Sequence, residues 1–313
     1  MFGFIINRLI ATIPVLGMVA LFVFLMLRLT PGDPAAVLAG DNGTPQQIAE
    51  IREALGLNEP ILVQLGIWFS NLLQGDFGQS YFFKKDVTEL ILLRVGPTVA
   101  LATTTLIFTI LVAIPLGVLA AYRRGTWIDR GVMAFSVAGF SIPVFVVGYL
   151  LVYLFALEIK LFPVQGYKPI ADGFGPFIHR LVLPSITLSV IYIALIARIT
   201  RASVLEVLNE DYIRTAYAKG LQPRVVLMRH ALRNAAVPII TVIGIGVALL
   251  IGGVVVTETV FNIPGLGRLT VDAVLGRDYP TIQAVIIVFS FVYVVINLLI
   301  DLSYSLLDPR IRY

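Results

Sequence analysis

Six long stretches of this chain contain no Asp, Glu, Lys or Arg, and each is long enough to cross a lipid bilayer. A transmembrane helix needs about 20 mostly apolar residues to cross a hydrocarbon core of roughly 30 Å. Backbone polar groups in lipid must find their hydrogen bonds inside the protein, so such runs predict helices. The six runs are Leu9–Leu27, Val95–Tyr122, Gly131–Leu157, Leu181–Ala197, Asn234–Thr257 and Thr281–Ile300. We therefore expect an all-α membrane protein with six transmembrane helices.

Composition supports this class and excludes several others. Of the 313 residues, 58% are hydrophobic and 13% are charged, whereas soluble domains carry about 25% charged residues. The chain has no cysteine, which rules out disulfides and thiolate chemistry. Its net charge of +4 is spread between apolar runs and forms no dense basic stripe, so nucleic acid is not an expected partner. A cleaved signal peptide is an alternative for the first run, but that run exceeds the usual apolar length of about 7 to 15 residues.

The basic residues predict the orientation of the spans. With the N-terminus inside, the inner segments hold 13 Lys and Arg residues. The short outer loops hold five, namely Lys160, Lys168, Arg180, Arg268 and Arg277. Because Lys and Arg accumulate in cytoplasmic loops, both termini are expected in the cytoplasm.

This topology divides the chain into three parts. Residues 1–29 form the N-terminus and first transmembrane helix, residues 30–96 form a long extracytoplasmic loop with short helices, and residues 97–313 form a five-helix core. Within the outer loop, Thr44-Pro45 starts a helix that Gly56 ends. Asn58–Leu73 predicts a second helix that is too short to span and is expected to pack across the outer mouth. A solvated cap without a role toward substrate is an equally weighted alternative.

Features that are missing from the chain reduce the number of functional classes to which it can belong. The spans contain no ionisable residue of the kind that proton- or ion-coupled carriers keep inside the membrane. No lysine follows a glycine, so the chain has no P-loop for ATP. The two histidines, His179 and His230, are predicted on opposite sides of the membrane, which disfavours a metal site or an enzyme. Any energy for uphill transport is therefore expected from a partner.

Some residues in and near the spans have more than one interpretation. Gly244, Ala248 and Gly252 form a small-residue stripe that permits close helix packing, either within the chain or against a second membrane subunit. Glu258 lies at the outer end of the fifth span. It either faces the transport path, where it would meet a peptide amine, or is a helix-end charge in water, and we favour the second reading. The prolines expected to kink their helices are Pro115, Pro143 and Pro184.

The inner loop, residues 198–233, carries the signals of a short helix. Asn209 is a good N-cap, and acidic residues follow it in the first turn, where the helix dipole favours negative charge. Gly220 can close the helix in a left-handed conformation. These signals predict a helix over Glu210–Lys219.

A break at Gln222-Pro223 then leads into a second, basic helix over Arg224–Asn234. The short first helix between two spans is shaped to fit a groove on another protein. An amphipathic connector lying on lipid headgroups explains the same residues equally well.

This loop resembles that of a known family. The stretch Glu210-Asp-Tyr-Ile-Arg-Thr-Ala-Tyr-Ala-Lys-Gly-Leu221, followed by Arg229-His-Ala-Leu-Arg-Asn-Ala235 and Pro238, is similar to the permease subunits of dipeptide and oligopeptide ABC importers. Almost the whole chain shares the resemblance. Further matching motifs are Pro31-Gly-Asp-Pro34, Leu55-Gly-Leu57, Gly75-Asp-Phe-Gly78, Glu258-Thr-Val-Phe-Asn-Ile-Pro-Gly-Leu-Gly267, Arg277-Asp-Tyr-Pro280 and Asp308-Pro-Arg-Ile-Arg312. The chain departs from the general importer pattern of the loop, of which only Ala216, Gly220 and Leu232 match.

The resemblance implies a type I ABC importer permease fold in which the short helix is a coupling helix. Such a helix docks in a cleft of a cytoplasmic ATPase and transmits its motion without doing chemistry, so the subunit is not an enzyme. The residues expected at this ATPase-coupling interface are Asp211, Tyr212, Arg214, Thr215, Ala216, Lys219 and Gly220.

The resemblance also implies the partners and the location. They are a homologous second permease, two cytoplasmic ABC ATPase subunits that bind ATP and Mg, and an extracytoplasmic solute-binding protein, with membrane lipid around them. The chain itself needs no cofactor, and the location is the bacterial cytoplasmic (inner) membrane. The expected substrates are dipeptides or oligopeptides, with glutathione, nickel chelates or another small solute as alternatives. A self-sufficient carrier or channel is the competing class.

Overall fold

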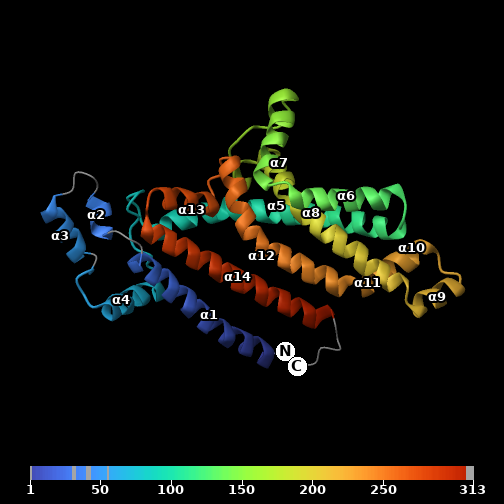
Figure 1. Ribbon diagram of the computed structural model, residues 1–313, viewed down its shortest axis with the longest axis horizontal. Coiled ribbons are helices and arrows are strands. Elements are labelled where there is room, and N and C mark those ends of the chain that lie inside the picture. Colours follow the sequence, from blue (N-terminus) through green and yellow to red (C-terminus); the bar gives the residue numbers. More distant parts are fainter. Residues whose placement is uncertain (1, 30–32, 40–43, 55, 308–313) are drawn as a thin grey trace. The chain divides into compact units, whose positions relative to one another are not determined.

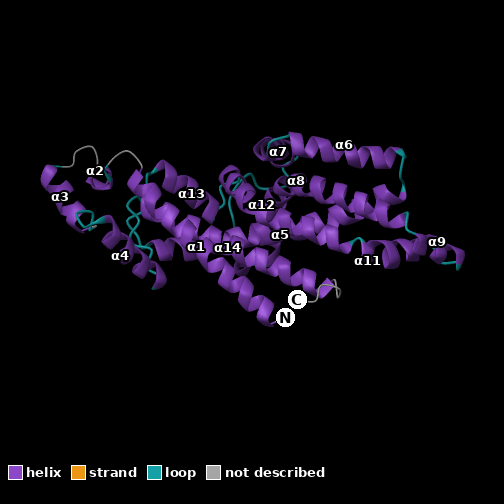
Figure 2. Cartoon of the chain, turned by 60° about the horizontal axis from the view of Figure 1, so that its bottom comes forward, coloured by secondary structure: helices purple, strands orange, loops and turns teal. Residues whose placement is uncertain are grey.

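The computed structural model describes residues 2–29, 33–39, 44–54 and 56–307. Helices form most of this part of the chain, and an isolated β-bridge between Gln79 and Asp86 is its one extended pairing (Figure 2). Three of the family-like motifs fall at its edges, and Leu55 of Leu55-Gly-Leu57 lies outside the described residues. Pro31-Gly, the first half of Pro31-Gly-Asp-Pro34, and all of Asp308-Pro-Arg-Ile-Arg312 lie outside the described residues.

Most of the helices follow one another with short connections, and the longer described ones are residues 74–86 and 159–169 (Figure 1). In chain order the helices are α1 (Phe2–Leu29), α2 (Pro34–Ala39), α3 (Pro45–Ala54), α4 (Ile61–Leu73), α5 (Val87–Tyr122), α6 (Trp127–Ser141), α7 (Val144–Leu151), the π-helix η1 (Val152–Glu158), the 3-10 helix η2 (Ile170–Asp172), α8 (Phe174–Leu208), α9 (Asp211–Ala218), α10 (Pro223–Val225), the π-helix η3 (Val226–Ala231), α11 (Leu232–Asn234), α12 (Ala236–Val260), α13 (Leu266–Leu275) and α14 (Tyr279–Leu307).

Four of the described helices are long and apolar enough to cross a membrane, namely α5, α8, α12 and α14. A fifth candidate is the bent pair formed by α6 with α7 and η1. The apolar run Gly131–Leu157 was predicted as one span with a kink at Pro143, and the structure divides it there into two helices. The chain turns by 106° between the two halves, at the Ile142-Pro143 step, because a proline cannot donate a backbone hydrogen bond to continue the helix. The expected break at Pro143 is thus confirmed.

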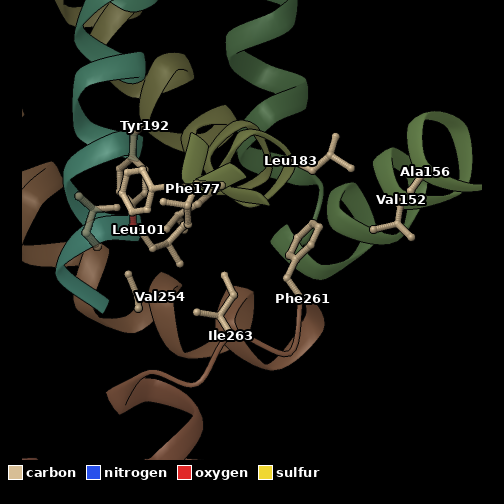
Figure 3. Packing of buried hydrophobic residues seen from close by; sticks show 12 residues of the cluster. Leu101, Val152, Ala156, Phe177, Leu183, Tyr192, Val254, Phe261 and Ile263 are labelled. Carbon is tan, nitrogen blue, oxygen red and sulfur yellow. The ribbon is translucent and has the colours of Figure 1, made fainter. Parts of the chain in front are cut away.

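The chain folds into two compact units. The first comprises residues 1–95 and 269–294, and the second comprises residues 96–268 and 295–313. In the second unit, α8 is the central helix and packs against α6, α7 and α12. Side chains from α5, η1, α8, α12 and the turn after α12 form the main core, and Figure 3 labels nine of its residues. They are Leu101, Val152, Ala156, Phe177, Leu183, Tyr192, Val254, Phe261 and Ile263.

Small residues determine how closely the helices of the second unit approach. At Gly117 on α5, a β-carbon would lie 2.6 Å from the Ala197 carbonyl oxygen of α8. Thr104 of α5 also lies 2.8 Å from Ser185 of α8, oxygen to oxygen. Because residue numbers increase together along both contacts, α5 and α8 run parallel.

Helix α8 is much longer than the apolar run Leu181–Ala197 that predicted it. It extends to Leu208, so residues 198–208 of the expected inner loop are its last turns. Charged side chains do not interrupt a helix where it leaves the hydrocarbon, and apolarity alone therefore underestimates its length. Pro184 lies within the continuous helix.

In the first unit, α3 begins and ends as predicted. Thr44 and Gln47 exchange two hydrogen bonds across the first turn, which is a capping box. Gly56 has a φ of +64°, the left-handed conformation that ends a helix. The second predicted helix starts at Ile61 rather than Asn58, because Pro60 has an extended ψ of 142° and precedes it as the N-cap.

Buried Asp278 links separate segments of the first unit. It precedes α14 and accepts hydrogen bonds from Ser80, from the Tyr81 backbone N–H at 3.0 Å and from the Thr281 hydroxyl at 2.6 Å. The motif Arg277-Asp-Tyr-Pro280 therefore both caps α14 and holds the chain that precedes α5.

Candidate functional site

Helix α9 is the predicted inner-loop helix, and its ends differ slightly from expectation. It covers Asp211–Ala218, against the predicted Glu210–Lys219. Asn209 was predicted as its N-cap, and this was wrong. Asn209 instead ends α8, and its side chain donates to the Leu205 carbonyl at 2.9 Å. Glu210 occupies the N-cap position with an extended backbone.

The left-handed end of α9 is confirmed. Gly220 has a φ of +79°, and its N–H donates to the Tyr217 carbonyl at 2.9 Å. The N–H of Leu221 then reaches back to the Ala216 carbonyl at 3.3 Å. This pair of bonds satisfies the last carbonyls of a short helix, so Gly220 defines where α9 stops.

One side of α9 packs on its own subunit. Ile213 and Ala216 are 1% and 6% exposed and belong to a cluster of small and aliphatic side chains. The other buried members come from α5, α8, η3, α12 and the residue that precedes α12. They are Val118, Ala121, Val204, Val226, Ala231, Ala235 and Ile239. Ala216 was expected at the partner interface, but it faces this cluster. Its small side chain lets α9 lie close to the helices beneath it.

The opposite side of α9 is exposed. It carries the remaining residues expected at the interface, namely Asp211, Tyr212, Arg214, Thr215, Lys219 and Gly220. Arg214 and Asp211 form an ion pair at 3.3 Å, with side chains 77% and 95% exposed. Tyr217 is exposed on this surface as well and was missed by the sequence analysis. In Figure 1, α9 lies beyond the end of α8, beside α10 and α11.

A hydrogen-bond chain connects α9 to α11 and η3, which lead into α12. The Asn234 amide donates to the Tyr212 hydroxyl at 2.9 Å and to the His230 carbonyl at 2.8 Å. The predicted basic helix over Arg224–Asn234 exists, but its middle is the π-helix η3. Movement of α9 is thus constrained by α8, which precedes it, and by α12, which follows.

A buried ion pair joins α6 to α8 near α9. Arg201 makes two hydrogen bonds to Asp129, one of them 2.8 Å long, and Asp129 also accepts the Gly125 N–H at 2.9 Å. Asp129 is 4% exposed. Sequence analysis missed this pair because its members are far apart in the chain and each lies beside an apolar run rather than within it.

Neither interpretation of Glu258 fits its surroundings. The residue is fully buried, and its carboxylate accepts the Thr98 hydroxyl at 2.6 Å and the Arg268 backbone N–H at 3.0 Å. The Leu266 N–H donates in turn to Thr98 at 2.8 Å. Glu258 therefore caps the beginning of α13 and ties it to α5.

Gly265 is required by this cap, which leads to a prediction. A β-carbon at Gly265 would lie 2.1 Å from a carboxylate oxygen of Glu258, and that carboxylate is held in place by its hydrogen bonds. We expect Gly265→Ala to lower the free energy of unfolding by about 1–3 kcal/mol, as overpacking does. Gly252→Ala is the matched control, since no atom lies within 4 Å of its β-carbon. Thermal unfolding in detergent compares the two variants. Equal stability would contradict the capping role.

The predicted small-residue stripe on α12 divides into two environments. At Gly244 a β-carbon would lie 2.6 Å from the Ile300 side chain of α14, whereas Gly252 faces open space. The stripe therefore serves packing inside the chain at one end. At the other end it belongs to an exposed apolar surface with Ile245, Leu249 and Val256.

Comparisons with known proteins define the class of this helical protein. Residues 113–313 match the family described as binding-protein-dependent transport system inner membrane component. Residues 1–102 match the N-terminal family of the same membrane components. The chain belongs to this family of inner membrane transport proteins.

Individual relatives extend along the full chain. A probable peptide ABC transporter permease, y4tP of Sinorhizobium fredii, is 56% identical over 99% of both chains. A putative peptide transport system permease of Brucella abortus is 44% identical over 100% of both. The glutathione transport system permease GsiC of Salmonella choleraesuis is 42% identical over 100% of both.

A solved structure shares the fold. The chain resembles one from the MetNI methionine ABC transporter in an inward-facing conformation, with a TM-score of 0.57 and 18% identity. The match covers 70% of this chain and 96% of the other.

Proposed function

We propose that this protein is a membrane-spanning subunit of an ATP-driven importer and forms, with a homologous permease, the path for dipeptides or oligopeptides. Full-length similarity to permeases named for peptide transport carries this proposal. The glutathione permease among the relatives is named for a small peptide derivative, and glutathione is thus the alternative substrate of the same class.

Six crossings with both termini in the cytoplasm are part of the proposal. They are α1, α5, the bent pair of α6 with α7 and η1, α8, α12 and α14. The parallel course of α5 and α8 supports counting the bent pair as a crossing. If that pair entered and left on the same side, α8 would have to run antiparallel to α5. The excess of Lys and Arg in the expected inner segments supports the orientation.

In the complete transporter, α9 would be the coupling helix. Its exposed residues Asp211, Tyr212, Arg214, Thr215 and Lys219 would contact a cytoplasmic ATPase, with Gly220 ending the helix at that surface. Ala216 and Ile213 would support the contact from beneath. ATP and Mg would be bound by the ATPase subunits, because this chain has no P-loop. The subunit would transmit motion and catalyse no reaction.

The remaining partners follow from the same class of transporter. A second permease would complete the path, two ATPase subunits would lie on the cytoplasmic side, and a solute-binding protein would deliver cargo to the outer side. The long loop over residues 30–96 is the part of this chain that would lie nearest to that binding protein.

Copurification tests the proposal. The tagged chain is solubilised mildly from its native host, and the subunits that accompany it are identified by mass spectrometry. We expect a second permease together with P-loop ATPases. A stable homo-oligomer without any ATPase that transports peptide in liposomes would contradict the proposal and would favour a self-sufficient carrier.

A further inference from the structure

Helix α4 is apolar but too short to cross a membrane. Its 13 residues contain no charged side chain and extend about 20 Å at 1.5 Å per residue, against a hydrocarbon core of roughly 30 Å. One side of the helix, formed by Leu65, Trp68 and Leu72, is partly buried. The ring of Trp68 lies 5.6 Å, centroid to centroid, from that of Phe24 on α1. Helix α4 therefore packs beside α1 within the first unit.

The exposed surface of α4 has one wholly apolar side and one side of mixed character. Leu62, Phe69 and Leu73 follow one another at intervals of seven and four residues, which places them on one side of a helix. Leu62 is 78% exposed and Leu73 is 75% exposed. A different side carries exposed Ser70 and Asn71 and ends at the C-cap Gln74, and it also exposes Val63 and Ile67, so the polar groups gather toward the C-terminal end of α4. Such a distribution is typical of a helix that lies between lipid and water.

The contact with α1 indicates how deeply α4 would lie in the membrane. Phe24 precedes the end of α1 at Leu29 by five residues, or about 8 Å of helix. If α1 crosses the membrane as in the proposed function, on which this inference rests, α4 lies near the outer boundary of the hydrocarbon. Helix α1 also exposes large apolar side chains, among them Ile13 and Met18, so the surface next to α4 suits lipid.

We propose that α4 is an interfacial helix in the outer leaflet, with Leu62, Phe69 and Leu73 in lipid and Ser70, Asn71 and Gln74 toward water. A lipid surface fits better than a soluble partner because the apolar side is continuous and uncharged and lies beside a transmembrane helix. The helix would fix the outer loop to the membrane. It would not form a water-exposed cap, nor would it close the outer mouth of the path.

Spin labelling can test this directly, because the chain has no native cysteine. Single cysteines replace Leu62 and Leu73 on the apolar side, and Ser70 and Gln74 on the polar side of the same helix. The assembled transporter is labelled with a nitroxide in liposomes. Power saturation then compares collisions with oxygen, which concentrates in lipid, and with a water-soluble nickel chelate.

We expect labels at Leu62 and Leu73 to collide mainly with oxygen and labels at Ser70 and Gln74 to collide mainly with nickel. Nickel access at all four positions would overturn the inference in favour of a solvated cap. Shielding of Leu62 and Leu73 from both reagents would overturn it in favour of a protein neighbour. A cysteine at Met18 on α1 separates this inference from the proposed function, because nickel access there would contradict the crossing itself.

Discussion

Replacing Gly220 with proline is expected to reduce energy-driven uptake to background while the protein still inserts in the membrane. Gly220 has a φ of +79°, and proline is restricted to about −65°. The substitution also removes the N–H that bonds to the Tyr217 carbonyl and disfavours the helical conformation of the preceding residue, Lys219. Helix α9 would then lose its defined end, and its exposed surface would no longer match a partner.

Gly220→Asn is the matched control for this experiment. Asparagine tolerates the left-handed conformation better than other side chains and keeps the backbone N–H, so its uptake should remain close to that of the wild type. Uptake into cells is measured together with the amount of protein in the membrane. Normal uptake by the proline variant at a normal membrane level would count against a coupling role for α9.

Removal of Arg201 is expected to cause the largest loss of stability. In Arg201→Met the carboxylate of Asp129, 4% exposed, keeps its charge without its counter-ion. Breaking one partner of a buried ion pair typically costs about 3–5 kcal/mol. Unfolding of the purified protein in detergent should therefore occur at a much lower temperature or denaturant concentration.

The double variant distinguishes the pair from general damage. Adding Asp129→Asn to Arg201→Met removes the buried charge and should recover part of the lost stability. Arg130→Gln changes an exposed neighbour of Asp129 and should have an effect within about 0.5 kcal/mol. Strictly additive losses in the double variant would show that Asp129 and Arg201 do not act together.

Local chemistry explains which features of the fold could be predicted from the sequence. The ends of α3 and α9 depend on Gly56 and Gly220, and glycine at a helix end is a local signal that needs no tertiary information. The bend at Pro143 also depends on a local signal, because proline lacks the backbone N–H that would continue a helix. The apolar runs located the long helices because the surroundings of a membrane helix select apolar side chains along its length.

Features that depend on distant contacts could not be predicted in this way. The partner of Asp129 lies on α8, and the partners of Glu258 lie on α5 and α13. A single sequence contains no signal for such pairings. Glu258 lies at the end of a span, and a glutamate there can meet substrate, water or a backbone N–H. Its position in the sequence does not distinguish these three, so it was interpreted as a path residue or a solvated charge.

The candidate interface could be predicted only in part. Its helix was predicted, and Ala216 was grouped with residues that the structure exposes although Ala216 itself is buried. Ile213 and Ala216 are three residues apart, which is one helical turn, so both lie on the same side of α9. The apolar Ile213 was a local signal that this side faces the subunit core. Attention to that spacing would have separated Ala216 from the exposed residues.

The central claim is that α9 contacts the ATPase, and photo-crosslinking from this helix tests it most directly. A cysteine replaces exposed Thr215 in the cysteine-free chain and is labelled with a benzophenone maleimide. The assembled transporter is irradiated, and the adducts are identified by mass spectrometry. The control carries its cysteine at Asp172, the exposed last residue of η2, in a segment expected on the outer side.

We predict an adduct between position 215 and a P-loop ATPase subunit, with none from position 172. Adducts of position 215 with lipid alone, in a complex that contains the ATPase, would contradict the claim. Helix α9 would then be a connector on the membrane surface.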